Sequence, residues 1–246
     1  MGEDTAAILY IDFGPQESVV PLSRVIELAH VRGIPVIVDA AAELPPVENL
    51  RRYISLGSDL VVFSGGKDIG APSDTGFVCG RKSLVDACFA LGPYYSATVN
   101  GERTYFLGRA MKTSKEDIAA LVVALRTYPE RSKEKVERCE SVIDSLIDGL
   151  SKIPHIHVKR VLPGPEDTIR PLTIPRVQVE QDPYSTPVEE ALRVLESGNP
   201  PIKLYSIGKS LFINPQCLTQ EEVPIIVERL KWALTDGASR ASAIRR

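Results

Sequence analysis

The chain of 246 residues has little surplus charge of either sign, since 29 lysines and arginines face 32 aspartates and glutamates and leave a formal net charge of −3. A protein that binds nucleic acid over a broad surface needs an excess of basic residues, because each neutralised phosphate releases counterions. A nucleic-acid partner is therefore not expected. No GxGxxG or Walker loop is present either, which disfavours a nucleotide-binding module.

The chain is also poor in residues that bind metal ions or form disulfides. The four cysteines are far apart and form no CxxC pair: Cys79, Cys88, Cys139 and Cys217. This spacing fits neither a zinc site nor a dense disulfide framework. His155 and His157 would share a face of one strand, but no third ligand follows nearby, so no metal site is predicted.

Long hydrophobic runs are missing as well. No apolar stretch approaches the ~20 residues that a membrane-spanning helix requires. The first four residues, Met-Gly-Glu-Asp, are acidic and do not resemble a secretory signal. The sixth residue is Ala6, where a myristoylation motif needs serine or threonine. These features predict a soluble cytoplasmic protein with no membrane partner.

The first half of the chain shows an alternation of apolar strands and amphipathic helices. Residues 6–11, 34–38 and 60–63 are apolar on both faces, as strands of parallel sheets tend to be. Helical patterns begin at Pro21 and Pro46. This order predicts an α/β fold with a mainly parallel sheet and right-handed crossovers. Residues 77–79 predict a further short strand, antiparallel at a turn.

The second half predicts a smaller α/β domain. Thr113 and Glu116 form a capping-box pattern before one helix, and the pattern changes at Tyr128–Pro129, before a second, long helix. We therefore expect a partial large domain over 1–128, a small domain over 129–236 and a disordered tail over 237–246. In the small domain, strands are expected near 155–162, 170–180, 203–206 and 211–214, with an antiparallel sheet, and helices after Thr186 and after Thr219 with Glu222.

Two residues of opposite charge follow buried strands in the predicted sheet. Asp39 ends the strand over 34–38, and Lys67 follows the strand over 60–63 after a short Ser-Gly-Gly turn. In open α/β sheets, ligands bind beyond the carboxyl ends of the strands. A buried charge is costly unless it is paired. The pair therefore predicts a ligand that satisfies both side chains.

Pyridoxal phosphate (PLP) is such a ligand. Its aldehyde condenses with a lysine amine, here Lys67, and an aspartate, here Asp39, keeps its ring nitrogen protonated. At ~4 Å and an effective dielectric constant of ~20, this attraction is about 4 kcal/mol. Ser64 could donate to the phosphate, Ala41 is small enough to lie against the ring, and the Gly65–Gly66 backbone could approach the cofactor closely.

Each residue also has a simpler interpretation. Asp39 alone could cap the next turn, and Lys67 alone could be a solvated loop residue. Their combination after two buried strands favours the cofactor. Arg109 and Arg170 are candidates for binding a substrate carboxylate or phosphate, because the arginine fork matches these anions. Surface ion pairs are the alternative for both arginines.

Several segments together resemble the selenocysteine synthase-like group of PLP-dependent enzymes, which includes L-seryl-tRNA selenium transferases and D-glucosaminate-6-phosphate ammonia-lyases. These segments cover residues 38–46 (VDAAAELPP), 58–67 (SDLVVFSGGK), 75–82 (TGFVCGRK), 108–112 (GRAMK) with 115–116 (KE), and 212–216 (FINPQ). The resemblance runs over nearly the whole chain, and the lysine segment is its most specific part.

The resemblance implies an aspartate-aminotransferase fold, Lys67 as the Schiff-base lysine, Asp39 as the partner of the ring nitrogen and Ser64 as a phosphate contact. It also implies elimination or β-replacement on an amino-acid or amino-sugar-acid substrate, in homo-oligomers with active sites at subunit interfaces. Members of the group carry a long segment before the position of Ala6 that supplies the phosphate-binding loop and a ring-stacking residue. The alternative expectation is therefore a truncated or split-gene non-catalytic subunit that needs a complementary amino-terminal chain.

Overall fold

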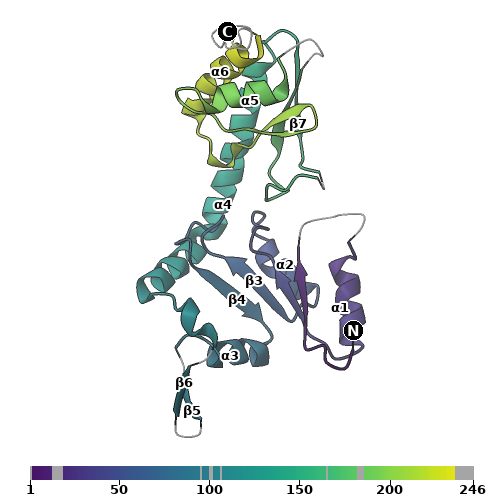
Figure 1. Cartoon of the computed structure of the whole chain (residues 1–246), viewed down its shortest axis with the longest axis vertical. Helices are drawn as coiled ribbons and strands as arrows, with labels where there is room; N and C mark the ends of the chain where they lie inside the picture. The colour runs from purple at the N-terminus through teal and green to yellow at the C-terminus, as the bar shows by residue number, and fades with distance from the viewer. Residues whose placement is uncertain are drawn as a thin grey trace. The chain divides into compact units, whose positions relative to one another are not determined.

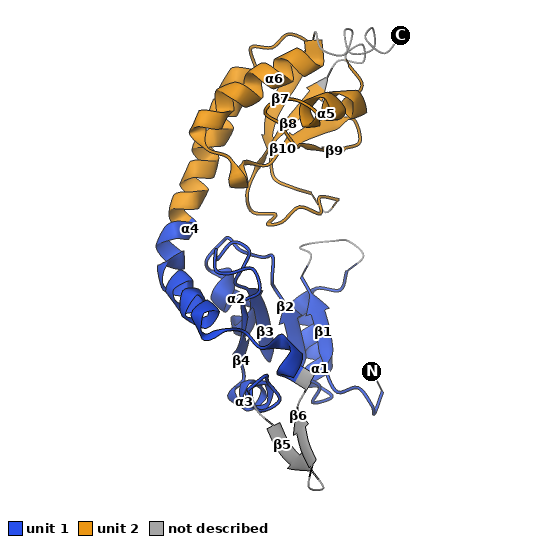
Figure 2. Ribbon diagram, turned by 60° about the vertical axis from the view of Figure 1, so that its left-hand side comes forward, with its two compact units in different colours: residues 1–132 blue, residues 133–246 orange. Residues whose placement is uncertain are grey.

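The computed structural model describes residues 2–12, 19–94, 96–99, 102–105, 107–164, 166–181 and 186–235. The chain divides into two compact units, residues 1–132 and 133–246 (Figure 2). The boundary expected at Tyr128–Pro129 falls inside a helix, close to this division. The tail expected to be disordered, residues 237–246, lies outside the described residues.

Unit 1 contains a four-stranded mixed sheet whose strand order follows the chain (Figure 1). Its strands are β1 (Ile8–Ile11), β2 (Val36–Asp39), β3 (Leu60–Ser64) and β4 (Gly76–Gly80). The first three are parallel and β4 is antiparallel to β3, so both expectations for this sheet are confirmed. The remaining elements of the unit are α1 (Leu22–His30), α2 (Asn49–Ser55), α3 (Lys82–Ala90), the hairpin β5 (Ser96–Val99) and β6 (Glu102–Tyr105), and the 3-10 helix η1 (Leu107–Met111).

The two faces of this sheet differ in burial. Residues alternate between the faces along each strand, and one face packs against α1, α2 and the first half of α4. Its strand residues are fully or nearly fully buried, namely Val36, Val38, Val61 and Phe63. On the other face, Leu9 is 64% exposed, Ile11 is 44% exposed and Val62 is 37% exposed. One face of the sheet is therefore packed, while the other is partly open among the described residues, although Leu60 on that face is buried.

Helix α4 (Lys115–Leu150) corrects the prediction of two helices. Pro129 lies inside it and cannot donate a hydrogen bond to the Leu125 carbonyl, a loss that costs about 3 kcal/mol in a helix interior. The helix nevertheless continues, because Leu121, Ala124 and Tyr128 bury one stripe in the unit 1 core. The predicted Thr113–Glu116 cap is wrong by one residue, since the Ser114 hydroxyl accepts from the Asp117 N–H at 3.0 Å.

Unit 2 contains a four-stranded sheet that is antiparallel, as predicted, and its strand order is β7-β8-β10-β9. Its elements are the second half of α4, β7 (Ile156–Val161), β8 (Arg176–Gln181), α5 (Val188–Glu196), β9 (Tyr205–Ile207), β10 (Ser210–Ile213), η2 (Pro215–Cys217), η3 (Gln220–Glu222) and α6 (Val223–Thr235). The Thr219–Glu222 capping box is confirmed. At the start of α5, Pro187 occupies the N-cap with no side-chain cap, so the cap assigned to Thr186 is wrong.

Candidate functional site

The candidate site lies where the neighbouring strands β2 and β3 end. Asp39 is the last residue of β2 and pairs with Val62 of β3, and the Ala40 N–H donates to the Val62 carbonyl at 3.0 Å. Side chains of directly paired residues in parallel strands share a face. Asp39 and Ser64 therefore lie on the exposed face of the sheet, and the turn after Ser64 carries Lys67.

The Asp39 carboxylate is half-buried and only partly satisfied. Its Oδ1 accepts from the Ala41 N–H at 3.0 Å, so Asp39 does shape the turn that follows it, as the simpler interpretation required. Its Oδ2 has no hydrogen-bond partner within the described part of the chain. One carboxylate oxygen thus remains available for a ligand. Ala41 is half-buried beside it, and its contact with a ring stays a prediction.

The Ser-Gly-Gly-Lys turn requires both glycines for reasons internal to the protein. A Cβ on Gly65 would collide with Thr75 Oγ1, and a Cβ on Gly66 would collide with the backbone of Ser73. The Gly65 N–H donates to the Thr75 carbonyl at 2.9 Å, which holds these two segments together. The structure therefore explains Gly65 by close packing on the Thr75 side chain and Gly66 by close packing on the Ser73 backbone, and close approach to a cofactor is not needed to account for them.

Lys67 lies exposed in this turn, and its Nζ has no hydrogen bond or ion pair among the described residues. The Ser64 hydroxyl, which is half-buried, likewise has no partner among them. The prediction that Asp39 and Lys67 are both buried charges is wrong. The strands are apolar, but Asp39 lies on a face that the described residues leave partly open, and Lys67 is exposed in the turn beyond β3.

Sequence reasoning missed two tyrosine–aspartate pairs beside these residues. The Tyr53 hydroxyl donates to Asp12 Oδ2 at 2.8 Å, and the Asp12 N–H donates to the Asp39 carbonyl at 3.1 Å. Burial first, and then the bond to Asp12, raises the pKa of Tyr53 above its ordinary value. Asp12 directly follows β1, and Asp39 is the last residue of β2, so the position of Asp12 at a strand end was the signal that could have identified it.

The second pair flanks the lysine. The Tyr128 hydroxyl of α4 donates to Asp68 Oδ2 at 2.6 Å, and burial and this bond raise the pKa of Tyr128. No local pattern reveals it, because 60 positions separate the two residues.

The two candidate substrate arginines lie in different units. Arg109 is exposed on η1 in unit 1. Arg170 is half-buried in the loop before β8 in unit 2, where Gln216 Nε2 donates to its carbonyl at 2.9 Å. Their roles toward a substrate stay predictions.

The histidines do not form a metal site. Strand β7 begins at Ile156, and His155 precedes it with a φ of 64°, so His155 and His157 do not alternate along one strand as expected. His30 is the last residue of α1, and its Nε2 lies 2.9 Å from Asp59 Oδ2. Within the residues that the structure describes, no group of three or more possible ligands could hold a metal ion.

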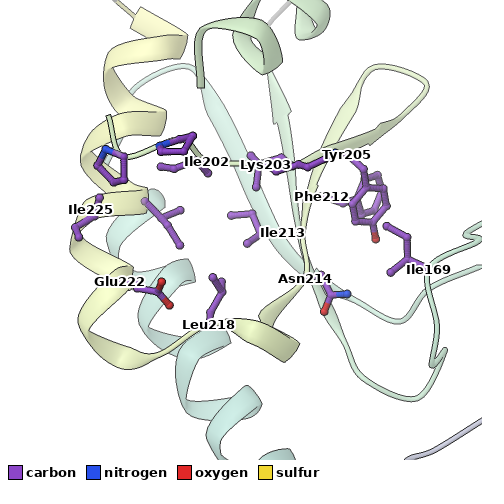
Figure 3. Close-up of a pocket in the computed structure, with 14 residues that line it drawn as sticks. Ile169, Ile202, Lys203, Tyr205, Phe212, Ile213, Asn214, Leu218, Glu222 and Ile225 are labelled. Carbon is purple, nitrogen blue, oxygen red and sulfur yellow. The ribbon is translucent and has the colours of Figure 1, made fainter. Parts of the chain in front are cut away.

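A separate cavity of about 390 Å³ lies in unit 2, between α6 and the strands β9 and β10 (Figure 3). Its lining is mainly apolar and includes the stacked rings of Tyr205 and Phe212, whose centroids are 5.4 Å apart. It contains none of the residues predicted to bind a cofactor. Among the described helices, none combines the length and apolar character needed to cross a bilayer.

Comparison with known proteins gives several relatives over nearly the whole chain. A 5′-C-glycyluridine monooxygenase-decarboxylase from Streptomyces sp is 34% identical over 94% of the chain and 55% of its own length. A D-glucosaminate-6-phosphate ammonia lyase from Salmonella typhimurium is 27% identical over 94% of the chain and 58% of its length. An L-seryl-tRNA(Sec) selenium transferase from Solidesulfovibrio magneticus is 26% identical over 94% of the chain and 53% of its length. No family model matches the chain.

A solved structure of D-glucosaminate-6-phosphate ammonia-lyase superposes with a TM-score of 0.70 at 24% identity, covering 98% of this chain and 60% of that chain. The fold is thus that of the PLP-dependent transferases of the aspartate-aminotransferase type. Within this class, the predicted resemblance to the selenocysteine synthase-like group is confirmed by its ammonia-lyase and selenium transferase relatives. The chain spans between half and three-fifths of the length of the relatives described here.

Proposed function

We propose that this chain carries the lysine and the ring-nitrogen partner of a PLP-dependent enzyme that acts on an amino-acid substrate. One observation carries the proposal. Three polar side chains, Asp39, Ser64 and Lys67, lie at or just beyond the ends of two neighbouring parallel strands, and each keeps unused hydrogen-bonding capacity within the described residues. The fold and the similarity to D-glucosaminate-6-phosphate ammonia lyase support the proposal.

Each of these residues has a distinct task in the proposal. Lys67 would hold the cofactor through Nζ, and Asp39 Oδ2 would accept a hydrogen bond from the ring nitrogen while Oδ1 stays bonded to the Ala41 N–H. Ser64 would donate its hydroxyl to the phosphate, and Ala41 would lie against the ring. Because Oδ1 is already held, the Asp39 carboxylate is oriented before any ligand arrives, which lowers the entropy cost of binding.

Bound PLP supplies an electron sink for the α-carbon of an amine substrate. The Lys67 amine, when free, would take the proton from that α-carbon as general base. The negative charge of Asp39 would keep the ring-nitrogen proton in place, which a neutral amide could not do equally well.

The relatives suggest the substrate class. Their names refer to glycyl, glucosaminate and seryl groups, each of which derives from an acid that carries an amine. We therefore propose an amino-acid or amino-sugar-acid substrate, processed by α-proton removal and β-elimination or replacement. Arg109 or Arg170 would bind its carboxylate or phosphate.

The exposed sheet face suggests how the site is completed. Parallel strands are ordinarily covered on both faces, but Leu9, Ile11 and Val62 are exposed on the face that bears Asp39. We propose that a second subunit or a complementary polypeptide covers this face and contributes the phosphate-binding and ring-stacking groups. A non-catalytic subunit is the less favoured alternative, because the relatives carry the names of enzymes.

A titration with PLP tests the cofactor proposal. The protein is titrated while the visible absorbance is followed, then reduced with borohydride, digested and analysed by mass spectrometry. We expect a permanent label on Lys67 that is absent in Lys67→Ala. Lys82→Ala is a matched control, because Lys82 is an exposed lysine of the same unit that is paired only with Asp86 at 2.6 Å. Absence of label at Lys67, or equal label on several exposed lysines, would overturn the proposal.

The proposal that a second subunit or a complementary polypeptide covers the exposed sheet face is tested separately. The chain is mixed with the part of the Salmonella ammonia lyase that it does not match, and the mixture is compared with each component by sedimentation and by PLP affinity. We expect a complex that binds PLP more tightly than the chain alone. Tight PLP binding by the chain as a monomer would contradict the proposal that a second polypeptide completes the site, but it would leave the role of Lys67 intact.

A further inference from the structure

The turn that carries Lys67 is held from within by backbone hydrogen bonds. The Gly70 N–H donates to the Lys67 carbonyl at 3.0 Å, and the Ala71 N–H donates to the Gly65 carbonyl at 2.9 Å. Ile69 is fully buried in the unit 1 core. The turn therefore has an anchored side chain two residues after Lys67, while the Lys67 side chain itself projects outward.

Helix α4 contributes a second set of contacts, from outside the turn. The hydroxyl of Tyr128, a residue only 1% exposed, donates to Asp68 Oδ2 at 2.6 Å. One helical turn further along, Arg131 Nη2 donates to the Ile69 carbonyl at 3.3 Å. Both donors reach the two residues that directly follow Lys67. All of these residues belong to unit 1, so the contacts lie within one compact unit.

The remaining side of the turn is fixed by packing. A Cβ on Gly66 would collide with the backbone of Ser73, so Gly66 lies directly against that segment. Gly66, which precedes Lys67, is thus held by contact with the backbone of Ser73. Asp68, which follows Lys67, is held by a charged hydrogen bond. Its own side chain has no partner within the described residues that would set its direction. The backbone of the turn therefore sets the direction of the Lys67 side chain.

We propose that Tyr128 and Arg131 are positioning residues for Lys67, acting through Asp68 and Ile69 to fix the direction in which the lysine leaves the turn. This inference rests on the proposed function for its purpose, although the contacts themselves do not. Tyr128 is the stronger of the two, because its bond is short and made to a carboxylate, whereas the Arg131 bond is longer and made to a neutral carbonyl.

The first test measures the turn without any cofactor. Amide hydrogen exchange at Gly70 and Ala71 reports the opening of the two backbone bonds that close the turn. Loss of one hydrogen bond to a charged group corresponds to about tenfold or more in an opening equilibrium. We expect exchange at these two amides to become about tenfold faster in Tyr128→Phe.

Tyr205→Phe is the matched control, because the Tyr205 hydroxyl makes an equivalent bond to Asp167 at 2.7 Å in unit 2. It should leave the exchange of Gly70 and Ala71 unchanged. Asp68→Ala should resemble Tyr128→Phe, and the double variant should add little to either single change, because both remove the hydrogen bond between these two side chains. Unchanged exchange in Tyr128→Phe, or full additivity in the double variant, would refute the positioning role.

The second test measures Lys67 itself. The rate of borohydride-trapped labelling at Lys67 by PLP should fall about tenfold in Tyr128→Phe and should not change in Tyr205→Phe. Faster exchange with an unchanged labelling rate would contradict the inference, because the turn would then be loosened with no effect on the lysine. If the unsubstituted protein is never labelled at Lys67, the proposed function fails, and the exchange result still decides whether α4 fixes the turn.

Discussion

Asp39 lies opposite Val62 in the register of β2 and β3, and this pairing places the Asp39 carboxylate on the same face of the sheet as the Ser64 hydroxyl. The same face bears the exposed side chains of Ile11 and Val62. A ligand that contacts Asp39 must therefore approach from the side that the helices of unit 1 leave uncovered. The following predictions test this site and the packing that supports it.

The carboxylate of Asp39 is expected to contribute to cofactor affinity. Asp39→Ala removes a charged acceptor, and a charged hydrogen bond contributes about 1.5–3 kcal/mol, so PLP affinity should fall tenfold or more. Asp39→Asn keeps one acceptor oxygen and should lose less affinity but most of the activity. Absorbance titration measures both. Asp86→Ala, which removes an exposed carboxylate of α3, should bind PLP as the parent does.

The glycines of the lysine turn are expected to resist substitution. A Cβ on Gly66 meets the backbone of Ser73, whereas a Cβ on Gly65 meets the Thr75 side chain, which can rotate in part. Gly66→Ala should therefore lower the free energy of unfolding by about 2–3 kcal/mol and Gly65→Ala by about 1–2 kcal/mol, as seen for overpacked sites. Urea unfolding gives both values. Gly2→Ala has nothing within 4 Å and should be neutral, and equal stability of all three variants would contradict the packing argument.

Arg176 is expected to stabilise the loop that carries Arg170. It is fully buried, and its guanidinium donates to the carbonyls of Ile174 at 2.6 Å, Ile169 at 3.1 Å and Pro171 at 3.2 Å. Arg176→Met leaves these acceptors without their donor and should cost about 3 kcal/mol of stability. Thermal unfolding measures the loss. Arg193→Met removes only an exposed bond to the Glu189 carbonyl and should change stability by less than about 0.5 kcal/mol.

Asp59 is expected to make stability depend on pH in the acid range. Burial alone would raise the pKa of its carboxyl, but the Val36 N–H, His30 and Arg81 outweigh burial and hold that pKa below its ordinary value of 3.8. A carboxyl whose pKa is lowered on folding stabilises the protein above its unfolded pKa, and this contribution is lost as the pH falls through the lowered value.

The free energy of unfolding of Asp59→Asn should accordingly lie about 2 kcal/mol below that of the parent at pH 6, and the gap should close as the pH drops below about 4. Urea titrations at several pH values measure it. Asp86→Asn, in an exposed pair with Lys82, should show a small difference throughout. A constant gap for Asp59→Asn down to pH 2 would argue against the lowered pKa.

The sequence by itself determined the order of strands and helices and the positions of Asp39 and Lys67 in that order. Local patterns suffice for this, because apolar runs, capping residues and glycine stops act over a few positions. The Thr219–Glu222 capping box and the antiparallel strands of unit 2 are examples. Where a local signal was ambiguous, as at Pro129, the prediction ended a helix that the structure continues.

Only the tertiary structure decided the environment of the site. It showed that Asp39 lies on a partly open face of the sheet, that Lys67 is exposed in the turn beyond β3, that the glycines serve packing within the turn, and that Tyr128 holds the residue next to the lysine. These facts depend on contacts between residues far apart in the chain and on which sheet face other elements cover. Periodicity specifies which strand residues share a face, but it does not specify what packs against that face.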